Sequence, residues 1–266
     1  LTSMKKIIII LAIGLFLFSC IDLITSSEDD FYESVHIEGS GWFEFYQNTQ
    51  DQYLELSDDF TFQVWFSGQE DTADEATCII SLNGETSKIS VYRNPNINNM
   101  LMIYNGQNLI QQVEVDSVDF NNYQNFYLLS IIKNQNQVTM YLNDNPISDD
   151  NGDPLIIENT DTIRPMVGAT LGTNPENLWY GYIDEMRLWN IALHDTVINF
   201  HNQYPTKVSS SYNDEYLESL NSLWDFRISM SETSISNVFQ DINEQLNYTT
   251  IYTVDSMINK LSEIGR

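Results

Sequence analysis

Apolar and polar side chains alternate in residues 60–66 of this chain. Phe60, Phe62, Val64 and Phe66 fall on one face of an extended strand, and the residues between them fall on the other face. A period of two matches a β-strand with one buried face and does not match the 3.6-residue period of a helix. This segment therefore predicts a strand that packs one face against a core.

The same pattern recurs along the chain. Residues 137–142 alternate again, and residues 126–133 form an apolar run rich in β-formers. An asparagine-rich turn joins these two segments and predicts a hairpin. Further short candidate strands, separated by turn sequences such as Asn83-Gly84 and Asn105-Gly106, lie at residues 78–82, 88–92, 100–104 and 111–116. Many short strands at intervals of about 8–12 residues predict an all-β sandwich or barrel.

Helical patterns are few and lie toward the C-terminal end. Residues 191–203 predict a helix with Asp195 as its N-cap and Pro205 just beyond its end. Residues 253–264 predict a second helix, with apolar residues on one stripe and Gly265 after it.

The N-terminal residues match an export signal. Lys5 and Lys6 precede an apolar run at residues 7–18, which is 12 residues long. As a helix this run would be about 18 Å long, too short for a bilayer core of about 30 Å. Leu17-Phe18-Ser19-Cys20 resembles the bacterial lipobox, which implies cleavage before Cys20 and lipid attachment to its thiol. We therefore expect an exported protein, lipid-anchored to the bacterial outer membrane or cell surface.

The charge and the cysteines narrow the possible partners. The chain has 38 acidic residues against 11 basic ones and a formal net charge of −27. Such a surface repels phosphate backbones, which excludes nucleic acid as a partner. With Cys20 assigned to lipid, Cys78 is the remaining cysteine, so neither a disulfide framework nor a cysteine-based metal site is expected.

Several segments, in order, resemble the laminin G-like and pentraxin-like branch of the concanavalin A-like lectin/glucanase superfamily. The most specific of them is Tyr180-Gly181-Tyr182-Ile183-Asp184-Glu185-Met186-Arg187-Leu188-Trp189-Asn190-Ile191-Ala192-Leu193. The other segments are residues 52–56 with 60–66, residues 126–132 with 138–143, and residues 166–169. Within the long string we interpret Ile183, Met186, Leu188 and Trp189 as core, Gly181 as a bulge or close backbone approach, and Asp184, Glu185 and Arg187 as a local network.

The resemblance covers about residues 40–205 and implies a two-sheet antiparallel jelly-roll sandwich with minor helix at the C-terminal end. The expected organisation is a signal peptide at 1–19, a lipidated tether at 20–38, the laminin G-like jelly roll at 39–205 and a C-terminal extension at 206–266. The extension is either an extra strand plus a helix or the start of a truncated second repeat.

The resemblance also implies binding of glycan or polysaccharide beside the signature string. The expected ligand-binding residues are Trp179, Tyr180, Tyr182 and Asn177, with Trp42, Tyr92, Tyr104 and Tyr123 as further aromatic candidates. Related domains hold calcium in nearby loops, where this chain offers Asp74, Glu75 and Asn177 as ligands. However, only one carboxylate, Glu176, lies between Gly168 and Gly181, which departs from the family pattern.

The sequence does not predict an enzyme. Retaining glucanases of this superfamily set two carboxylates on one strand face, and no E-x-D-x-x-E string occurs here. Asp184 and Glu185 are adjacent, so their side chains point to opposite faces of a strand. We therefore predict a non-catalytic surface or periplasmic lipoprotein that binds glycan. The alternatives are a module for protein–protein adhesion or envelope assembly and, less favoured, a divergent glycoside hydrolase.

Overall fold

The computed structural model describes residues 34–39, 41–47, 53–69, 75–115, 118–171, 175–205, 219–224 and 247–253. All of these segments belong to one compact unit. The predicted lipobox at Cys20, the predicted calcium ligand Asp74 and residues 254–264 of the second predicted helix lie outside the described residues.

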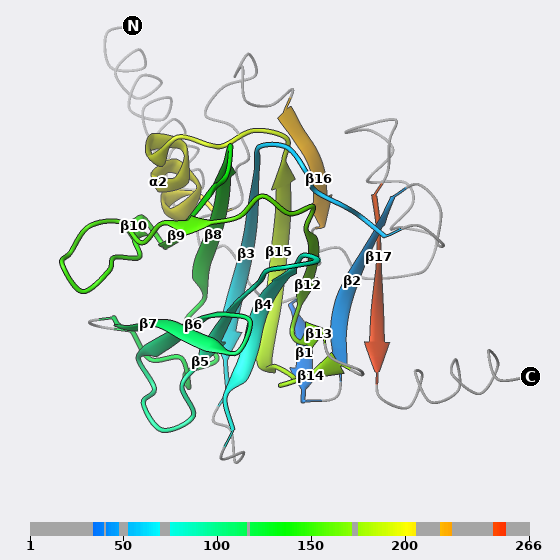
Figure 1. Ribbon diagram of the computed structural model, residues 1–266. Coiled ribbons are helices and arrows are strands. Elements are labelled where there is room, and N and C mark those ends of the chain that lie inside the picture. Colours follow the sequence, from blue (N-terminus) through cyan, green and yellow to red (C-terminus); the bar gives the residue numbers. More distant parts are fainter. Residues whose placement is uncertain are drawn as a thin grey trace, which may run out of the picture. The chain divides into compact units, whose positions relative to one another are not determined.

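Two antiparallel sheets make up this unit (Figure 1). The first sheet, called sheet A, has the order β1-β15-β3-β8-β9-β10, with β11 also paired to β9 and β16 to β15. Its strands are β1 (Val35–Glu38), β3 (Phe60–Gly68), β8 (Tyr127–Asn134), β9 (Gln137–Leu142), β10 (Asn145–Pro146), β11 (Ile157–Glu158), β15 (Tyr180–Trp189) and β16 (Leu220–Trp224).

The second sheet, called sheet B, has the order β17-β2-β12-β4-β5-β6-β7. Its strands are β2 (Gly41–Gln47), β4 (Thr77–Asn83), β5 (Lys88–Arg93), β6 (Met100–Asn105), β7 (Asn108–Glu114), β12 (Arg164–Val167) and β17 (Asn247–Thr253). The strands β13 (Thr170–Leu171) and β14 (Pro175–Glu176) pair with each other and form a separate two-stranded sheet. The predicted all-β, two-sheet antiparallel sandwich is confirmed, and strands from the segment 206–266 join both sheets.

The core lies between the two sheets and follows the predicted alternation. Phe60, Phe62, Val64 and Phe66 of β3 are all buried in it, and Ile183, Met186 and Leu188 of β15 pack into the same cluster. Each large apolar side chain removed from water contributes about 1.5–3 kcal/mol, so this set accounts for much of the driving force for folding.

A smaller cluster lies on the other face of sheet A, under helix α2 (Asp195–Gln203), and contains Trp189 and Ile198. The helix was predicted, but its N-cap is His194 and not Asp195. His194 is extended and its ring accepts from the backbone N–H of Thr196, whereas Asp195 is already helical. His201 is fully buried and stacks on Trp189, with ring centroids 5.1 Å apart. No helix in the described segments has the length and hydropathy needed to cross a bilayer.

The acidic residues of the signature string belong to the structure of β15. A register shift between Ile183 and Met186 interrupts the alternation of this strand. Glu185 forms a buried ion pair with Arg187, whose guanidinium also donates to the carbonyl of Pro205 and lies 4.5 Å from the ring centre of Trp65. The prediction that these charged residues pair locally is therefore confirmed for Glu185 and Arg187.

Two glycines face each other where β15 runs beside β3. Gly181 is the register partner of Gly68. A Cβ on Gly181 would lie 2.1 Å from the carbonyl oxygen of Ser67, and one on Gly68 would lie 1.6 Å from that of Phe120. The predicted close backbone approach at Gly181 is confirmed, and its φ of +147° suits a residue without a side chain. The irregularity of β15 lies beyond it, between residues 183 and 186.

The strands predicted from alternation and turn sequences have boundaries close to the observed ones, except at β7. This strand was predicted from residue 111, but it begins at Asn108. The reason is the tight turn at Gly106, which has a φ of +62° and brings the chain straight back along β6. In the segment 52–56, which was expected to open the sandwich, Leu56 forms an isolated bridge with Ile163 and no strand.

Asp161 links the turn between β4 and β5 to the segment that precedes β12 through hydrogen bonds. Its carboxylate accepts from the backbone N–H groups of Thr86 and Ser87, at 2.8 and 2.7 Å, and from both of their hydroxyls. Gly84 leaves the space that the carboxylate occupies, since a Cβ there would lie 2.5 Å from it. The N–H of Thr86, followed by the other donors, lowers the pKa of Asp161 to about 2.

This lowered pKa predicts an acid-dependent contribution of Asp161 to stability. A carboxyl group whose pKa is lower in the folded chain stabilises it fully above its unfolded pKa, about 3.9, and progressively less as the pH falls through about 2. Asp161→Asn should therefore lower the midpoint of urea unfolding at pH 7, and its difference from the wild type should shrink between about pH 4 and pH 2. Asp144→Asn, in the turn after β9, is the control. A difference that stays constant over this pH range would contradict the assignment.

Candidate functional site

A pocket of about 470 Å³ lies at the rim of the sandwich, beside the start of β15. We call it the rim pocket. It is lined by Gly39, Glu75, Ala76, Thr77, Glu176, Asn177, Leu178 and Tyr180. These residues come from the turn after β1, from the start of β4 and from the segment that joins β14 to β15. Figure 1 shows β1, β13 and β14 close together at one end of the sheets. The volume of the rim pocket lies within the range of about 300–1,000 Å³ that is common for small-molecule sites.

Backbone hydrogen bonds hold the walls of the rim pocket together. Trp179 donates to Gly168 at 2.8 Å and accepts from Gly39 at 2.9 Å. The N–H of Cys78 donates to the carbonyl of Asn177 at 2.7 Å. The segment before β15 is therefore tied both to the turn after β1 and to the first residues of β4, so the rim pocket is formed before any ligand arrives.

Asn177 is a structural part of the wall as well as a lining residue. Its φ is +52°, a left-handed conformation that asparagine tolerates better than most residues. Its amide donates to the carbonyl of Ala76 at 3.3 Å and accepts from the hydroxyl of Thr170 at 3.4 Å. Asn177 was predicted as a binding residue, and the structure places it in the rim pocket with both ends of its amide in contact with the protein.

Thr77 is the lining residue that sequence reasoning missed. Its side chain is 4% exposed, and its hydroxyl has no hydrogen-bond partner among the described residues. A buried hydroxyl without a partner costs about 1–3 kcal/mol, so a ligand that penetrates the pocket wall far enough to bond to it would recover part of this cost. The sequence carries no signal for this role, because a threonine just before an apolar run is typical of any strand start.

The rim pocket is acidic. Glu75 and Glu176 contribute exposed carboxylates, and none of the eight lining residues is basic. The predicted calcium ligands Glu75 and Asn177 do meet here. Calcium takes 6–8 oxygen ligands, however, and the described residues bring together no group of three or more His, Cys, Asp or Glu side chains that could hold a metal. The third predicted ligand, Asp74, lies outside the described residues, so the calcium site stays a prediction.

The three aromatic residues predicted to bind ligand separate in the structure. Tyr180 lines the rim pocket, and its ring occupies the space that a Cβ on Gly39 would fill, 2.3 Å from the ring. Tyr182 lies two residues further along β15, outside the rim pocket.

Trp179 is fully buried, with its ring 5.8 Å from that of Phe66 and 5.4 Å from the guanidinium of Arg93. It cannot offer an exposed platform, so this part of the prediction is wrong. The reason is that Trp179 points into the core, opposite to its neighbour Tyr180.

The further aromatic candidates also differ in how far their side chains are exposed to solvent. Trp42 is buried at 2% exposure. Tyr92 and Tyr104 are half-buried on the outer face of sheet B, edge to face with ring centres 5.1 Å apart. Burial raises the pKa of Tyr92 to about 12. Tyr123 is the most exposed of the four, at 53%.

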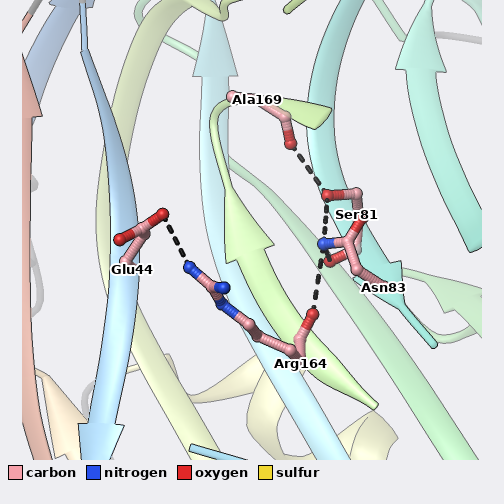
Figure 2. A network of polar contacts seen from close by, with 5 residues as sticks. All are labelled: Glu44, Ser81, Asn83, Arg164 and Ala169. Atoms are coloured by element: carbon pink, nitrogen blue, oxygen red, sulfur yellow. Dashed lines mark hydrogen bonds and ion pairs between the residues drawn. The ribbon is translucent and has the colours of Figure 1, made fainter. Parts of the chain in front are cut away.

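Figure 2 shows a polar network on the outer face of sheet B. Glu44 forms an ion pair with Arg164 at 2.8 Å. The amide of Asn83 donates to the carbonyl of Arg164 and to the hydroxyl of Ser81, which in turn donates to the carbonyl of Ala169 at 2.9 Å. The network drawn contains one carboxylate, whereas a retaining glycosidase places two at about 5–5.5 Å from each other. Its arrangement is that of a structural network joining β2, β4 and β12.

Comparisons with known proteins agree with this architecture. A family model described as the concanavalin A-like lectin/glucanases superfamily matches residues 40–199. A search of curated proteins finds no match.

Among solved structures, a protein from Bacteroides ovatus described as a candidate carbohydrate-binding protein is 16% identical, with a TM-score of 0.46. The match covers 83% of this chain and 61% of that one, so this chain spans less than two thirds of its length. The heptameric SAP-like pentraxin of Limulus polyphemus is 10% identical, covering 82% of this chain and 97% of that one, with a TM-score of 0.39.

A third similar structure is the CBM40 of the Ruminococcus gnavus IT-sialidase, bound to α2,3-sialyllactose. It is 13% identical, covering 64% of this chain and 96% of that one, with a TM-score of 0.41. The family model spans more than half of the chain, and the two antiparallel sheets are consistent with it. The chain therefore belongs to the concanavalin A-like lectin/glucanases superfamily.

Proposed function

We propose that this chain is a non-catalytic carbohydrate-binding protein that recognises neutral glycans in the rim pocket. The observation that carries the proposal is that Thr77 lines the rim pocket and has a hydroxyl, buried beneath the pocket surface, with no hydrogen-bond partner among the described residues. Sugar hydroxyls both donate and accept, as the threonine hydroxyl does, so a sugar that enters deeply enough to reach this buried oxygen would supply its missing hydrogen bond. Tyr180 beside it supplies an aromatic wall for the apolar part of the ligand.

The charge of the rim pocket favours a neutral ligand over an anionic one. Glu75 and Glu176 stand at its wall, no lining residue is basic, and the whole chain has a formal net charge of −27. Bringing a sialic acid or uronic acid carboxylate beside these groups would place like charges together without a compensating cation. Neutral hexoses and pentoses meet no such repulsion.

Two features support binding without catalysis. Glu75 and Glu176 are exposed to solvent, whereas enzyme sites generally exclude water from the groups that react. Glu44, in the network of Figure 2, is held by Arg164 in an ion pair and has no second carboxylate in that network. The glycosidase alternative therefore gains no support from either place.

The experiment is a glycan array followed by calorimetry, on the full chain kept in mild detergent. We expect binding to neutral glycans and not to sialyllactose. Thr77→Val keeps the shape of the side chain and removes its hydroxyl. It should therefore lower the affinity for the neutral ligand about fivefold, the effect of losing one hydrogen bond worth about 1 kcal/mol.

The same variant should leave thermal stability unchanged or slightly raised, because the hydroxyl has no partner in the free protein. Thr139→Val, on β9 of sheet A, is the matched control and should bind as the wild type does. Binding of anionic glycans alone, absence of binding to any glycan, or a Thr77→Val variant with unchanged affinity would contradict the proposal. Absence of glycan binding would favour a protein partner at the cell surface.

We also propose that the protein acts at the bacterial outer membrane or cell surface, anchored through lipid on Cys20. The support is the sequence Leu17-Phe18-Ser19-Cys20 after a short apolar run and two lysines. A single acyl chain binds a membrane only marginally, and two or more anchor a protein stably. A lipid anchor would hold the rim pocket at a surface where polysaccharides are available.

This anchoring is tested by expressing the chain and its Cys20→Ser variant in a Gram-negative host and separating membranes from the soluble fraction. We expect the wild type in the outer-membrane fraction, with a mass increase on the peptide that begins at Cys20. The variant should lose both the added mass and the outer-membrane location. An unmodified Cys20 in the mature wild-type protein would contradict the anchor.

A further inference from the structure

Three aromatic rings meet on the outer face of sheet A, next to the rim pocket. Strand β1 pairs with β15 so that His36 lies opposite Tyr182. The two rings are stacked, with centroids 4.3 Å apart and planes 14° from parallel. Tyr123, from the segment before β8, lies against the same tyrosine, with ring centroids 6.0 Å apart. We call these three residues the aromatic platform.

The aromatic platform is open to solvent. Tyr123 is 53% exposed, His36 is exposed and Tyr182 is half-buried. Single apolar residues on a surface need no explanation, but aromatic rings grouped at one place are typical of a binding surface. Tyrosine is well suited to this use, because its ring offers a large apolar face at a low cost in conformational entropy.

Neighbouring polar groups hold the rings in place. The Nε2 atom of His36 lies 2.6 Å from the side-chain oxygen of Gln69. The segment that carries Tyr123 is fixed to β3 by the hydroxyl of Ser67, which donates to the carbonyl of Asn122 at 3.2 Å. An ordered platform loses little entropy on binding, so more of its contact energy appears as affinity.

The aromatic platform is continuous with the rim pocket. Tyr180 and Tyr182 are two residues apart on β15 and so lie on the same face, about 6.6 Å apart along the strand at a rise of 3.3 Å per residue. Gln69 connects the two places, because its side chain contacts His36 while its backbone N–H donates to the carbonyl of Tyr180 at 3.3 Å. A chain of linked sugars can therefore extend from one to the other.

We infer that Tyr123, supported by the stacked rings of Tyr182 and His36, forms a second subsite, which stacks the apolar face of a neutral sugar ring belonging to the same glycan that the rim pocket holds. This inference rests on the proposed function and adds to it the class of ligand, a linear oligosaccharide rather than a single sugar. The C–H groups on one face of a pyranose ring match the face of a tyrosine ring.

The test compares chain lengths. Cellohexaose, mannohexaose and xylohexaose are each titrated into the full chain by calorimetry, with glucose, mannose and xylose as their single-sugar counterparts. We expect one hexasaccharide to bind at least tenfold more tightly than its monosaccharide. Tyr123→Ala should lower the affinity for that hexasaccharide about fivefold, as the loss of one aromatic stacking partner does, and leave the monosaccharide unaffected.

Two further variants separate stacking from folding. Tyr123→Phe keeps the ring and should bind as the wild type does, and Tyr204→Ala removes a tyrosine of similar exposure, 44%, from the end of α2. If Thr77→Val weakens binding while Tyr123→Ala does not, the rim pocket stands and the platform is overturned. Equal affinity for hexasaccharide and monosaccharide also overturns the platform. If none of these sugars binds and the array shows no glycan ligand, both proposals fall.

Discussion

The close contact between Gly68 of β3 and Gly181 of β15 is the constraint on which the functional end of this protein depends. Neither position has room for a Cβ, since the nearest backbone oxygens would lie 1.6 and 2.1 Å away. With both glycines in place, the two strands and the segment around Phe120 approach each other backbone to backbone. Trp179 is then buried beside them, and its neighbours Leu178 and Tyr180 line the rim pocket.

This contact positions the residues of the candidate site that lie before and after Gly181 in the chain. The backbone of Trp179 bonds to Gly168 and Gly39, which brings Glu176, Asn177 and Tyr180 to the wall of the rim pocket. Beyond Gly181 lies Tyr182, which is on the same face of β15 as Tyr180 and stacks on His36. A rigid pair of sheets thus presents a polar, acidic pocket and an aromatic surface side by side. Such a combination suits ligands that, like neutral sugars, have hydroxyl edges and apolar faces.

Sequence alone predicted the sandwich well, because alternation is dictated by burial. Phe60 to Phe66 and the string from Tyr180 to Leu193 placed the core strands correctly. It did less well at the site. Trp179 was taken for a binding residue, but whether an aromatic side chain faces ligand or core depends on a change of direction outside the regular strand. Thr77 was missed, since its role comes from the lack of a nearby partner, which only three-dimensional packing reveals. The N-cap of α2 was misplaced by one residue, because His194 and Asp195 can both accept from the N–H of Thr196.

The central claim is that one end of the sandwich binds neutral glycan, and NMR spectroscopy tests it most directly. An isotope-labelled sample of the full chain would be titrated with cellohexaose, mannohexaose and xylohexaose while backbone amide signals are followed. The account predicts that one of these sugars shifts the signals of Thr77, Asn177 and Tyr180, and leaves those of α2 and of the turn at Gly106 unchanged. Shifts confined to the outer face of sheet B, around Glu44 and Arg164, would contradict it, as would a spectrum that neither these three sugars nor any other neutral glycan of the array changes.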